Sequence, residues 1–235
     1  MEDQYNWESK FEDCIYSSKL LDKLILLNQQ AVQKIDIVEV KKAIFYAKQY
    51  HASQIRQSGE PYYSHPLEVA YMISDYLFRT DIIVTSILHD TLEDTDLNYA
   101  MIVDIFGTLV ATQVEDLTRI KRDQKISSAE MVESLWIQKK YDVLLIKQFD
   151  RLHNMQTIAA KSPEKIQKII TETMSTFTVL AAYLGIRDVE EELIACCRSF
   201  IKNYAKDAED ELLKQKDEKL LSLIIQSDVL HKQKL

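Results

Sequence analysis

Leu88-His89-Asp90-Thr91-Leu92-Glu93-Asp94 is the stretch of this chain that reveals most about its fold and its chemistry. The apolar run of residues 82–88 ends in a histidine that is followed at once by an aspartate, so a ring nitrogen and a carboxylate lie together at the end of a buried helix. Two more carboxylates follow about one turn later and can reach water near a bound ion. The stretch predicts the start of a metal site, although an isolated His-Asp pair is more often a chance occurrence.

Two distant segments strengthen the metal hypothesis. His65 stands directly before Pro66, and Asp150 follows the buried apolar run of residues 143–149. Each lies at the edge of a predicted helix. A carboxylate in such apolar surroundings must be paired or bound to a metal. His65 and Asp150 therefore favour the hypothesis that His89 and Asp90 begin a metal site.

The composition predicts an all-α fold, a helical bundle. The chain has 235 residues, enough to bury a full core, and only three glycines and three prolines. Turn-rich β architectures need more of both, and apolar residues recur here at helical spacing. The predicted helices cover, approximately, residues 7–33, 35–55, 66–78, 81–89, 98–106, 107–121, 163–184 and 188–205, with further helix in 128–157 and in the C-terminal tail.

Local signals set the expected ends of these helices. Residues 56–62 break the chain between two helices, and the polar residues 121–128 are expected to form a flexible loop. The predicted caps and breaks are, in chain order, Thr80 or Asp81, Gly107, Ser127 or Ser128, Ser162-Pro163 and Gly185.

Charge and cysteine content restrict the partners and the compartment. The formal net charge is −8, which argues against nucleic-acid binding because phosphate backbones need a basic surface. No apolar stretch is long enough to span a bilayer, so we expect no membrane partner. Cys14, Cys196 and Cys197 show no spacing typical of metal ligands or of a disulfide framework, which favours the reducing cytoplasm.

Several polar residues near these segments have two readings. Arg56 is either a solvated helix-end charge or a group that grips a phosphate or stacks on a base. If the helix that carries Asp150 continues, Asn154 and Thr157 share its face, although Asn154 alone fits a helix cap equally well. Arg151 is either a phosphate contact or a structural ion-pair partner. His51 is expected to be structural.

Four motifs in fixed order resemble the HD-type hydrolase domain of the RelA/SpoT alarmone enzymes. They are Arg-x-Ser-Gly-Glu-Pro-Tyr at 56–62, His-Pro-Leu-x-Val-Ala at 65–70, Leu-His-Asp-x-x-Glu-Asp-Thr at 88–95 and Asp-Arg-Leu-His-Asn-Met-x-Thr at 150–157. The resemblance covers roughly residues 38–186. It implies an HD-domain helical bundle that removes the 3′-pyrophosphate of guanosine tetra- or pentaphosphate.

The resemblance also implies a role for each matching residue. The ligands of a single Mn²⁺ would be His65, His89, Asp90 and Asp150, a donor set that suits manganese. Glu93 and Asp94 would position or deprotonate the attacking water. The predicted substrate contacts are Arg56, Ser58, Asn154, Thr157 and Arg151, and further cations that would offset phosphate charge are Lys48, Lys147 and Lys161.

Two departures from the family pattern leave the exact nucleotide open. Gln57 stands where the family commonly has lysine, and within residues 177–183 Phe177, Ala182 and Tyr183 stand where the family often has tyrosine, histidine and arginine. Another nucleotide such as NADPH is therefore an alternative substrate, and a silent nucleotide-sensing module is a third reading. About fifty residues follow Ile186, too few for the synthetase domain of long family members.

The sequence predicts three parts. Residues 1–35 form an accessory N-terminal helix, residues 36–200 the HD hydrolase domain, and residues 201–235 a C-terminal helical tail. The two flanking parts are expected to serve packing or self-association, so the chain is a candidate homo-oligomer.

Overall fold

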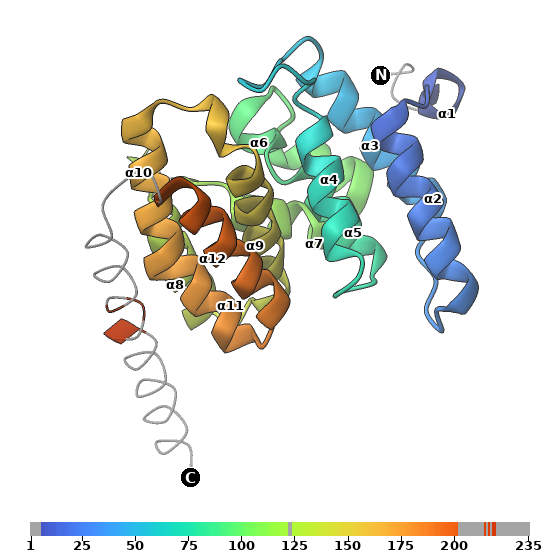
Figure 1. Cartoon of the computed structure of the whole chain (residues 1–235). Coiled ribbons are helices and arrows are strands. Elements are labelled where there is room, and N and C mark those ends of the chain that lie inside the picture. Colours follow the sequence, from blue (N-terminus) through green and yellow to red (C-terminus); the bar gives the residue numbers. More distant parts are fainter. Residues whose placement is uncertain (1–5, 122–123, 202–213, 215, 217, 220–235) are drawn as a thin grey trace. The chain divides into compact units, whose positions relative to one another are not determined.

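A computed structural model describes residues 6–121, 124–201, 214, 216 and 218–219 (Figure 1). Helices dominate these residues, which confirms the predicted all-α class. β-structure among these residues comprises a two-stranded antiparallel ladder of two residues per strand, β1 (Ile120–Lys121) with β2 (Gln124–Lys125), within the segment predicted to be a loop, and an isolated bridge between Ile55 and Pro61. No helix of the described part is both long and apolar enough to cross a bilayer. The chain divides into two compact units, Met1–Asp150 and Arg151–Leu235.

The first unit is built around α5 (Thr80–Leu88). Every residue from 82 to 88 is buried, and most of these residues are apolar, so this helix lies inside the fold. Around it pack α3 (Ile37–His51), α4 (Ser64–Ile73) and α7 (Tyr99–Leu117). His89 and Asp90 follow directly at the C-terminal end of this central helix, and the short α6 (Thr91–Asp94) comes next.

The N-terminal segment forms two helices, so the single predicted helix over 7–33 was wrong in its first part. The chain forms α1 (Trp7–Lys10), turns, and starts again as α2 (Ile15–Gln30). The break has a local cause: the Ser17 hydroxyl accepts the Cys14 backbone N–H at 2.7 Å and fixes the start of α2. Helix α2 packs on α4 through ion pairs such as Lys19 with Glu68 at 2.7 Å.

Most of the predicted caps and breaks are present. Gly107 interrupts α7 with φ 84° and ψ 166°, and Ser127 caps α8 (Ser128–Ile137) in a capping box with Glu130. The cap predicted for α5 was wrong, because α5 begins at Thr80 itself and the Thr80 hydroxyl accepts the Asp36 backbone N–H at 2.9 Å. Its hydroxyl therefore supports the start of α3.

The second unit holds the chain beyond Asp150. It contains the end of α9 (Tyr141–Gln156), the 3₁₀ turn η2 (Ile158–Ala160), α10 (Pro163–Glu172), the π-helical segment η3 (Thr173–Phe177), α11 (Thr178–Leu184) and α12 (Arg187–Ile201). Ser162 precedes α10, and Gly185 ends α11 with φ 73°, as predicted. The predicted tail over 201–235 lies largely outside the described residues.

Candidate metal centre

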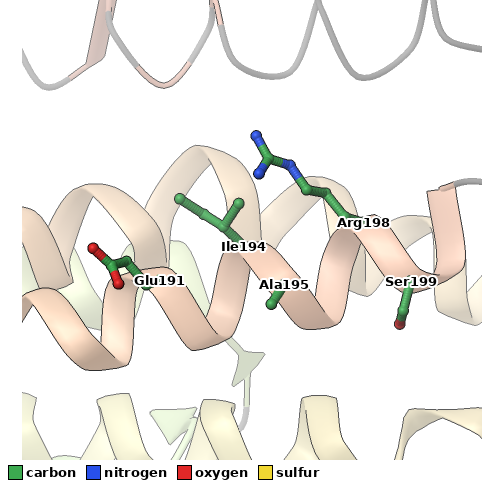
Figure 2. A pocket seen from close by; sticks show the side chains of 5 residues that line it. All are labelled: Glu191, Ile194, Ala195, Arg198 and Ser199. Atoms are coloured by element: carbon green, nitrogen blue, oxygen red, sulfur yellow. The ribbon is translucent and has the colours of Figure 1, made fainter.

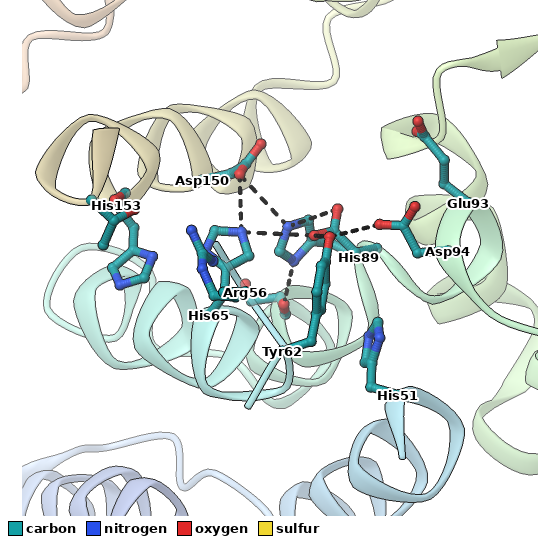
Figure 3. A network of polar contacts seen from close by, with 12 residues as sticks. His51, Arg56, Tyr62, His65, His89, Glu93, Asp94, Asp150 and His153 are labelled. Carbon is teal, nitrogen blue, oxygen red and sulfur yellow. Dashed lines mark hydrogen bonds and ion pairs between the residues drawn. The ribbon is translucent and has the colours of Figure 1, made fainter. Parts of the chain in front are cut away.

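Three side chains from three separate helical segments converge in the first unit. His65 lies at the start of α4, His89 directly after α5, and Asp150 on α9, and their ligand atoms all lie within 4.8 Å of one another (Figure 3). His65 Nε2 is 3.1 Å from Asp150 Oδ1, and His89 Nε2 is 3.8 Å from the same oxygen. The two histidine side chains are each only 2 % exposed. Buried imidazoles and a carboxylate in this arrangement have the donor chemistry of a metal site.

His89 turns one ring nitrogen toward this centre. Its Nδ1 lies 2.8 Å from the Ser86 carbonyl oxygen, which can only accept, so this nitrogen carries the proton. The buried Nε2 has no partner with hydrogen-bond geometry among the described residues. Once Nε2 has lost its proton, its lone pair faces the centre as a metal-binding histidine requires, and the contact of Nδ1 fixes the tautomer and the ring orientation.

The two carboxylate oxygens of Asp150 contact different partners. Its Oδ2 accepts the Lys147 ammonium at 2.6 Å from one turn earlier on α9, and its Oδ1 faces His65. The ion pair is buried, which explains how a carboxylate can stay charged in this interior. One oxygen of Asp150 is thereby directed at the centre.

Asp90 completes a four-residue set. Its Oδ1 is 3.2 Å from His89 Nε2 and its Oδ2 is 3.7 Å from His65 Nε2, while about a quarter of the side chain is exposed. Two ligands of one metal ion at bond lengths near 2.1 Å stand about 3–4 Å apart. The separations observed here, from 3.1 to 3.8 Å, are of this size. The ligand atoms that all lie within 4.8 Å of one another are those of His65, His89 and Asp150, and Asp90 as the fourth ligand stays a prediction.

The electrostatics keep both carboxylates ionised. Burial opposes the charge on Asp150, but Lys147 and the two histidines hold the pKa of Asp150 well below its usual range. Burial likewise opposes the charge on Asp90, and the histidines lower the pKa of Asp90 overall. The centre thus offers anionic oxygens to a cation.

The two histidines differ in protonation. Burial lowers the pKa of His65, so its imidazole is neutral at neutral pH. Burial acts in the same direction on His89, but the Asp90 and Asp150 carboxylates outweigh it and raise the pKa of His89 to about 9. A metal ion must therefore displace a proton from His89.

The predicted acidic pair points in two directions (Figure 3). Asp94 Oδ2 accepts the Tyr62 hydroxyl at 2.6 Å, beside Asp90. Glu93 instead accepts the guanidinium and the backbone N–H of Arg119, at 3.1 and 3.2 Å, and only 11 % of its side chain is exposed. Partial desolvation and the Asp90 and Glu93 charges raise the pKa of Asp94, and the hydrogen bond from Tyr62 opposes this rise.

The loop of residues 56–62 is a tight turn centred on Glu60. The Glu60 carboxylate accepts the Ser58 hydroxyl at 2.9 Å and lies 3.4 Å from Arg56 Nε. Gly59 adopts φ 99°, a conformation that favours glycine. Gln57 is exposed on the same turn. The turn therefore fixes where Arg56 and Ser58 stand relative to His65.

The other predicted substrate residues belong to the second unit. Arg151 is buried, forms an ion pair with Glu172 at 2.5 Å and stacks on the Phe177 ring at 4.2 Å, which is the structural alternative left open by the sequence. The Thr157 hydroxyl donates to the His153 carbonyl at 3.1 Å. Contact of the substrate with these two residues and with Asn154 stays a prediction.

Sequence reasoning missed three residues that contact the site. Tyr62 and Arg119 hold the acidic pair, and Lys147, expected only as a phosphate partner, holds Asp150. The spacing of Lys147 and Asp150 at i and i+3 is a signal for such an ion pair. No comparable signal links Tyr62 or Arg119 to residues about thirty positions away.

The second unit has a separate surface hollow of about 560 Å³ along α12 (Figure 2). The residues that line it are Glu191, Ile194, Ala195, Arg198 and Ser199. All five come from one helix, and none is a histidine or a cysteine. This hollow therefore lacks the converging ligands that distinguish the centre of the first unit.

Comparison with known protein families identifies the fold. The family described as HD domain matches residues 43–187, which include all four residues of the centre. The chain belongs to the HD-domain family. Because metal dependence is a property of HD-domain phosphohydrolases, the converging His65, His89 and Asp150 are this HD domain's candidate metal site.

Relatives of this HD domain confirm the predicted resemblance to RelA/SpoT proteins. This chain is 41 % identical over 160 residues to the GTP pyrophosphokinase rsh of Brucella ovis, and this match covers 66 % of this chain and 21 % of the relative. It is 37 % identical over 191 residues to the guanosine-3′,5′-bis(diphosphate) 3′-pyrophosphohydrolase of Aquifex aeolicus, covering 75 % and 27 %. With the bifunctional (p)ppGpp synthase/hydrolase SpoT of Escherichia coli K12 the identity is 33 % over 180 residues, covering 74 % and 26 %.

These matches span about a fifth to a quarter of the length of the relatives. Among solved structures, the HD domain is similar to a metazoan SpoT ortholog described as hydrolysing ppGpp. That similarity has a TM-score of 0.48 at 18 % identity and covers 81 % of this chain and 98 % of the other.

Proposed function

We propose that this HD domain hydrolyses the 3′-pyrophosphate of guanosine tetra- or pentaphosphate with the help of Mn²⁺. The observation that carries the proposal is the convergence of His65, His89 and Asp150, with Asp94 presented beside them. The names of the relatives from Aquifex aeolicus and Escherichia coli support the substrate and the reaction.

The residues that would hold the ion are His65, His89, Asp90 and Asp150. Two imidazoles with two carboxylates combine ligands that suit several divalent metals, and the oxygen ligands favour Mn²⁺. When bound, such an ion lowers the pKa of water and offsets phosphate charge. Lys147 keeps one oxygen of Asp150 occupied, so the other stays directed at the ion.

The remaining chemistry falls to the side chains of the chain. Water attacks the phosphorus attached to the 3′ oxygen, and Asp94 accepts a proton from that water as a general base. The bond between this phosphorus and the 3′ oxygen breaks, the 3′ oxygen departs with the nucleotide and takes up a proton from solvent, and pyrophosphate is released with the oxygen of the attacking water. Arg56, on the turn next to His65, is the candidate cation for the substrate phosphates or the guanine base.

The proposal is tested by turnover of the purified protein. Guanosine tetraphosphate is supplied with Mn²⁺, and pyrophosphate and inorganic phosphate are measured separately. We expect pyrophosphate, its loss with a chelator, and its return when Mn²⁺ is added again. Release of neither product from guanosine tetraphosphate would contradict the proposal.

Gln57 supports one alternative, a phosphohydrolase of another nucleotide such as NADPH. The exposed amide stands on the Arg56 turn, where the family commonly has lysine, so a charge expected near the nucleotide is missing. The same assay with NADPH distinguishes the two, because removal of its 2′-phosphate releases inorganic phosphate only.

A silent nucleotide-sensing module is the third reading. Replacing Asp90→Asn tests it, because the variant loses one of the four ligand carboxylates. A hydrolase then loses turnover and its biological effect together, whereas a sensor keeps its effect.

Four further expectations stay predictions. They are a cytoplasmic location, the absence of nucleic-acid and membrane partners, self-association into a homo-oligomer, and the division into residues 1–35, 36–200 and 201–235. The identity of the metal as Mn²⁺ is part of the proposal above and is tested with it.

A further inference from the structure

Tyr62 bridges two acidic residues of the candidate site. Its hydroxyl lies 2.6 Å from Asp94 Oδ2 and 3.2 Å from Asp90 Oδ2 (Figure 3). A phenol carries one proton at neutral pH and donates it to one acceptor at a time. The shorter contact is the stronger one, so the hydroxyl chiefly fixes the carboxylate of Asp94.

A second contact holds the backbone of the same residue. The side-chain amide of Gln54 donates to the Asp94 carbonyl oxygen at 2.9 Å, and its Oε1 accepts His51 Nδ1 at 2.9 Å. The His51 ring is 1 % exposed and stacks on Tyr62, with ring centroids 4.6 Å apart and an interplanar angle of 22°. His51 therefore contacts both Tyr62 and Gln54, each of which contacts Asp94.

Asp94 needs such support because it lies at an exposed helix end. It is the last residue of α6, a helix of four residues, and it is exposed to solvent. A side chain in this place has several rotamers available to it unless hydrogen bonds select one. Its Oδ1 accepts no hydrogen bond from any described residue, so the fixed carboxylate keeps one oxygen available to water.

We propose that Tyr62 and Gln54 form a clamp, supported by His51, that positions Asp94 to accept a proton from the attacking water. Tyr62 and Gln54 are positioning residues in this proposal, since both act through Asp94. The inference rests on the proposed function and deepens it, because it names the residues that position the proposed base. Glu93 contacts Arg119 instead of Tyr62 and lies outside this clamp.

Tyr62→Phe is the central test, because it removes one oxygen atom and keeps the ring against His51. We expect kcat to fall about 10- to 100-fold, the range found when a supporting hydrogen bond is lost at such sites, with KM and the Mn²⁺ dissociation constant within about twofold of the wild type. Tyr63→Phe is the matched control. It removes the hydroxyl of the next residue, whereas the Tyr63 ring still packs edge-on against Tyr16, and kcat should not change.

Gln54→Ala gives a second variant that removes the backbone contact. We expect kcat to fall again, and the double variant Tyr62→Phe/Gln54→Ala to lose less than the product of the two single losses, because both contacts hold one residue. If the two losses multiply in the double variant, the contacts act independently and the clamp is overturned. If Tyr62→Phe binds Mn²⁺ more weakly in proportion to its loss of turnover, the clamp is also overturned, since the hydroxyl would then act through Asp90.

Crystal structures of the wild type and Tyr62→Phe separate this inference from the proposed function. We expect a single Asp94 rotamer in the wild type and more than one in the variant. If the wild type releases no pyrophosphate from guanosine tetraphosphate, the proposed function fails. The positioning of Asp94 by Tyr62 still stands in that case if the variant shows more Asp94 rotamers than the wild type. If the wild type is active and Tyr62→Phe retains both its turnover and the Asp94 rotamer, the clamp fails and the proposed function stands.

Discussion

Whether His89 and Asp150 can bind a metal depends on which atom of each side chain faces the candidate centre. His89 uses Nδ1 to contact the Ser86 carbonyl, and Asp150 uses Oδ2 to contact Lys147. Each therefore presents its other atom to the place where His65 and Asp90 converge. Supporting contacts of this kind pre-arrange ligands, which reduces what an ion must reorganise on binding.

His89→Gln should abolish tight binding of Mn²⁺. The amide keeps a similar length but replaces a buried imidazole nitrogen, and we expect a dissociation constant at least about 100-fold higher, since one ligand is lost outright. Titration followed by electron paramagnetic resonance of free Mn²⁺ measures it. His153→Gln, at a histidine outside the candidate centre, is the control and should bind as the wild type does. Equal affinity of the wild type and His89→Gln would exclude His89 as a ligand.

Metal binding should depend on pH because His89 must lose a proton. The neighbouring carboxylates raise the pKa of His89 to about 9, so the ring is protonated at pH 7 in the absence of metal. The apparent affinity should rise about tenfold per pH unit up to about pH 9 and then level off. Competition with a Mn²⁺ indicator at several pH values measures the slope. An affinity that stays constant between pH 6.5 and 8.5 would contradict a protonated His89.

At the scale of elements, the sequence predicts what depends on local pattern. The apolar run of residues 82–88 identified α5 as buried, and Gly107, Ser127 and Gly185 marked real ends or breaks. What it missed depends on distant partners. Thr80 resembles a cap but contacts Asp36, and no local pattern shows that Arg119 would reach Glu93.

The same reasoning applies to the site itself. The four candidate ligands could be named from the sequence because their residue types stand in a known order of motifs, and the structure places these four side chains close together. That they bind a metal stays a prediction. The direction of each carboxylate was not predictable. Glu93 and Asp94 are adjacent in sequence, and only their tertiary partners make one face Arg119 and the other Tyr62.

Gly107→Ala should destabilise the fold through the backbone of α7. Gly107 adopts φ 84° and ψ 166°, a region open essentially to glycine alone, and an added Cβ would meet no atom within 4 Å. The cost is therefore conformational, about 1–3 kcal/mol in the free energy of unfolding. Urea denaturation measures it, and Thr108→Ala, at the exposed next residue, should change stability by less than about 0.5 kcal/mol. A Gly107→Ala protein as stable as the wild type would show that the kink relaxes freely.

At the scale of the whole molecule, the candidate centre belongs to one compact unit. All four predicted ligands lie within Met1–Asp150, although Asp150 is separated from His65 by 85 positions in the sequence. An ion that joined α4, the end of α5 and α9 would tie together parts of this unit that are far apart along the chain.

Mn²⁺ should therefore stabilise the first unit against unfolding. Both tryptophans, Trp7 and Trp136, belong to this unit, so their fluorescence reports its unfolding. At a free concentration 100 times the dissociation constant, the ion should add about 2.7 kcal/mol to the free energy of unfolding. Urea denaturation with and without Mn²⁺ measures the gain, which a chelator should reverse. An unchanged midpoint in the wild type would mean that the folded unit holds no ion.

The most direct test of the account is a crystal structure of the protein grown with Mn²⁺, with diffraction data collected at a wavelength where manganese scatters anomalously. We expect one anomalous peak within bonding distance of His65 Nε2, His89 Nε2 and one oxygen each of Asp90 and Asp150. The absence of a peak there in crystals grown with excess Mn²⁺, or a peak bound by other residues instead, would contradict it.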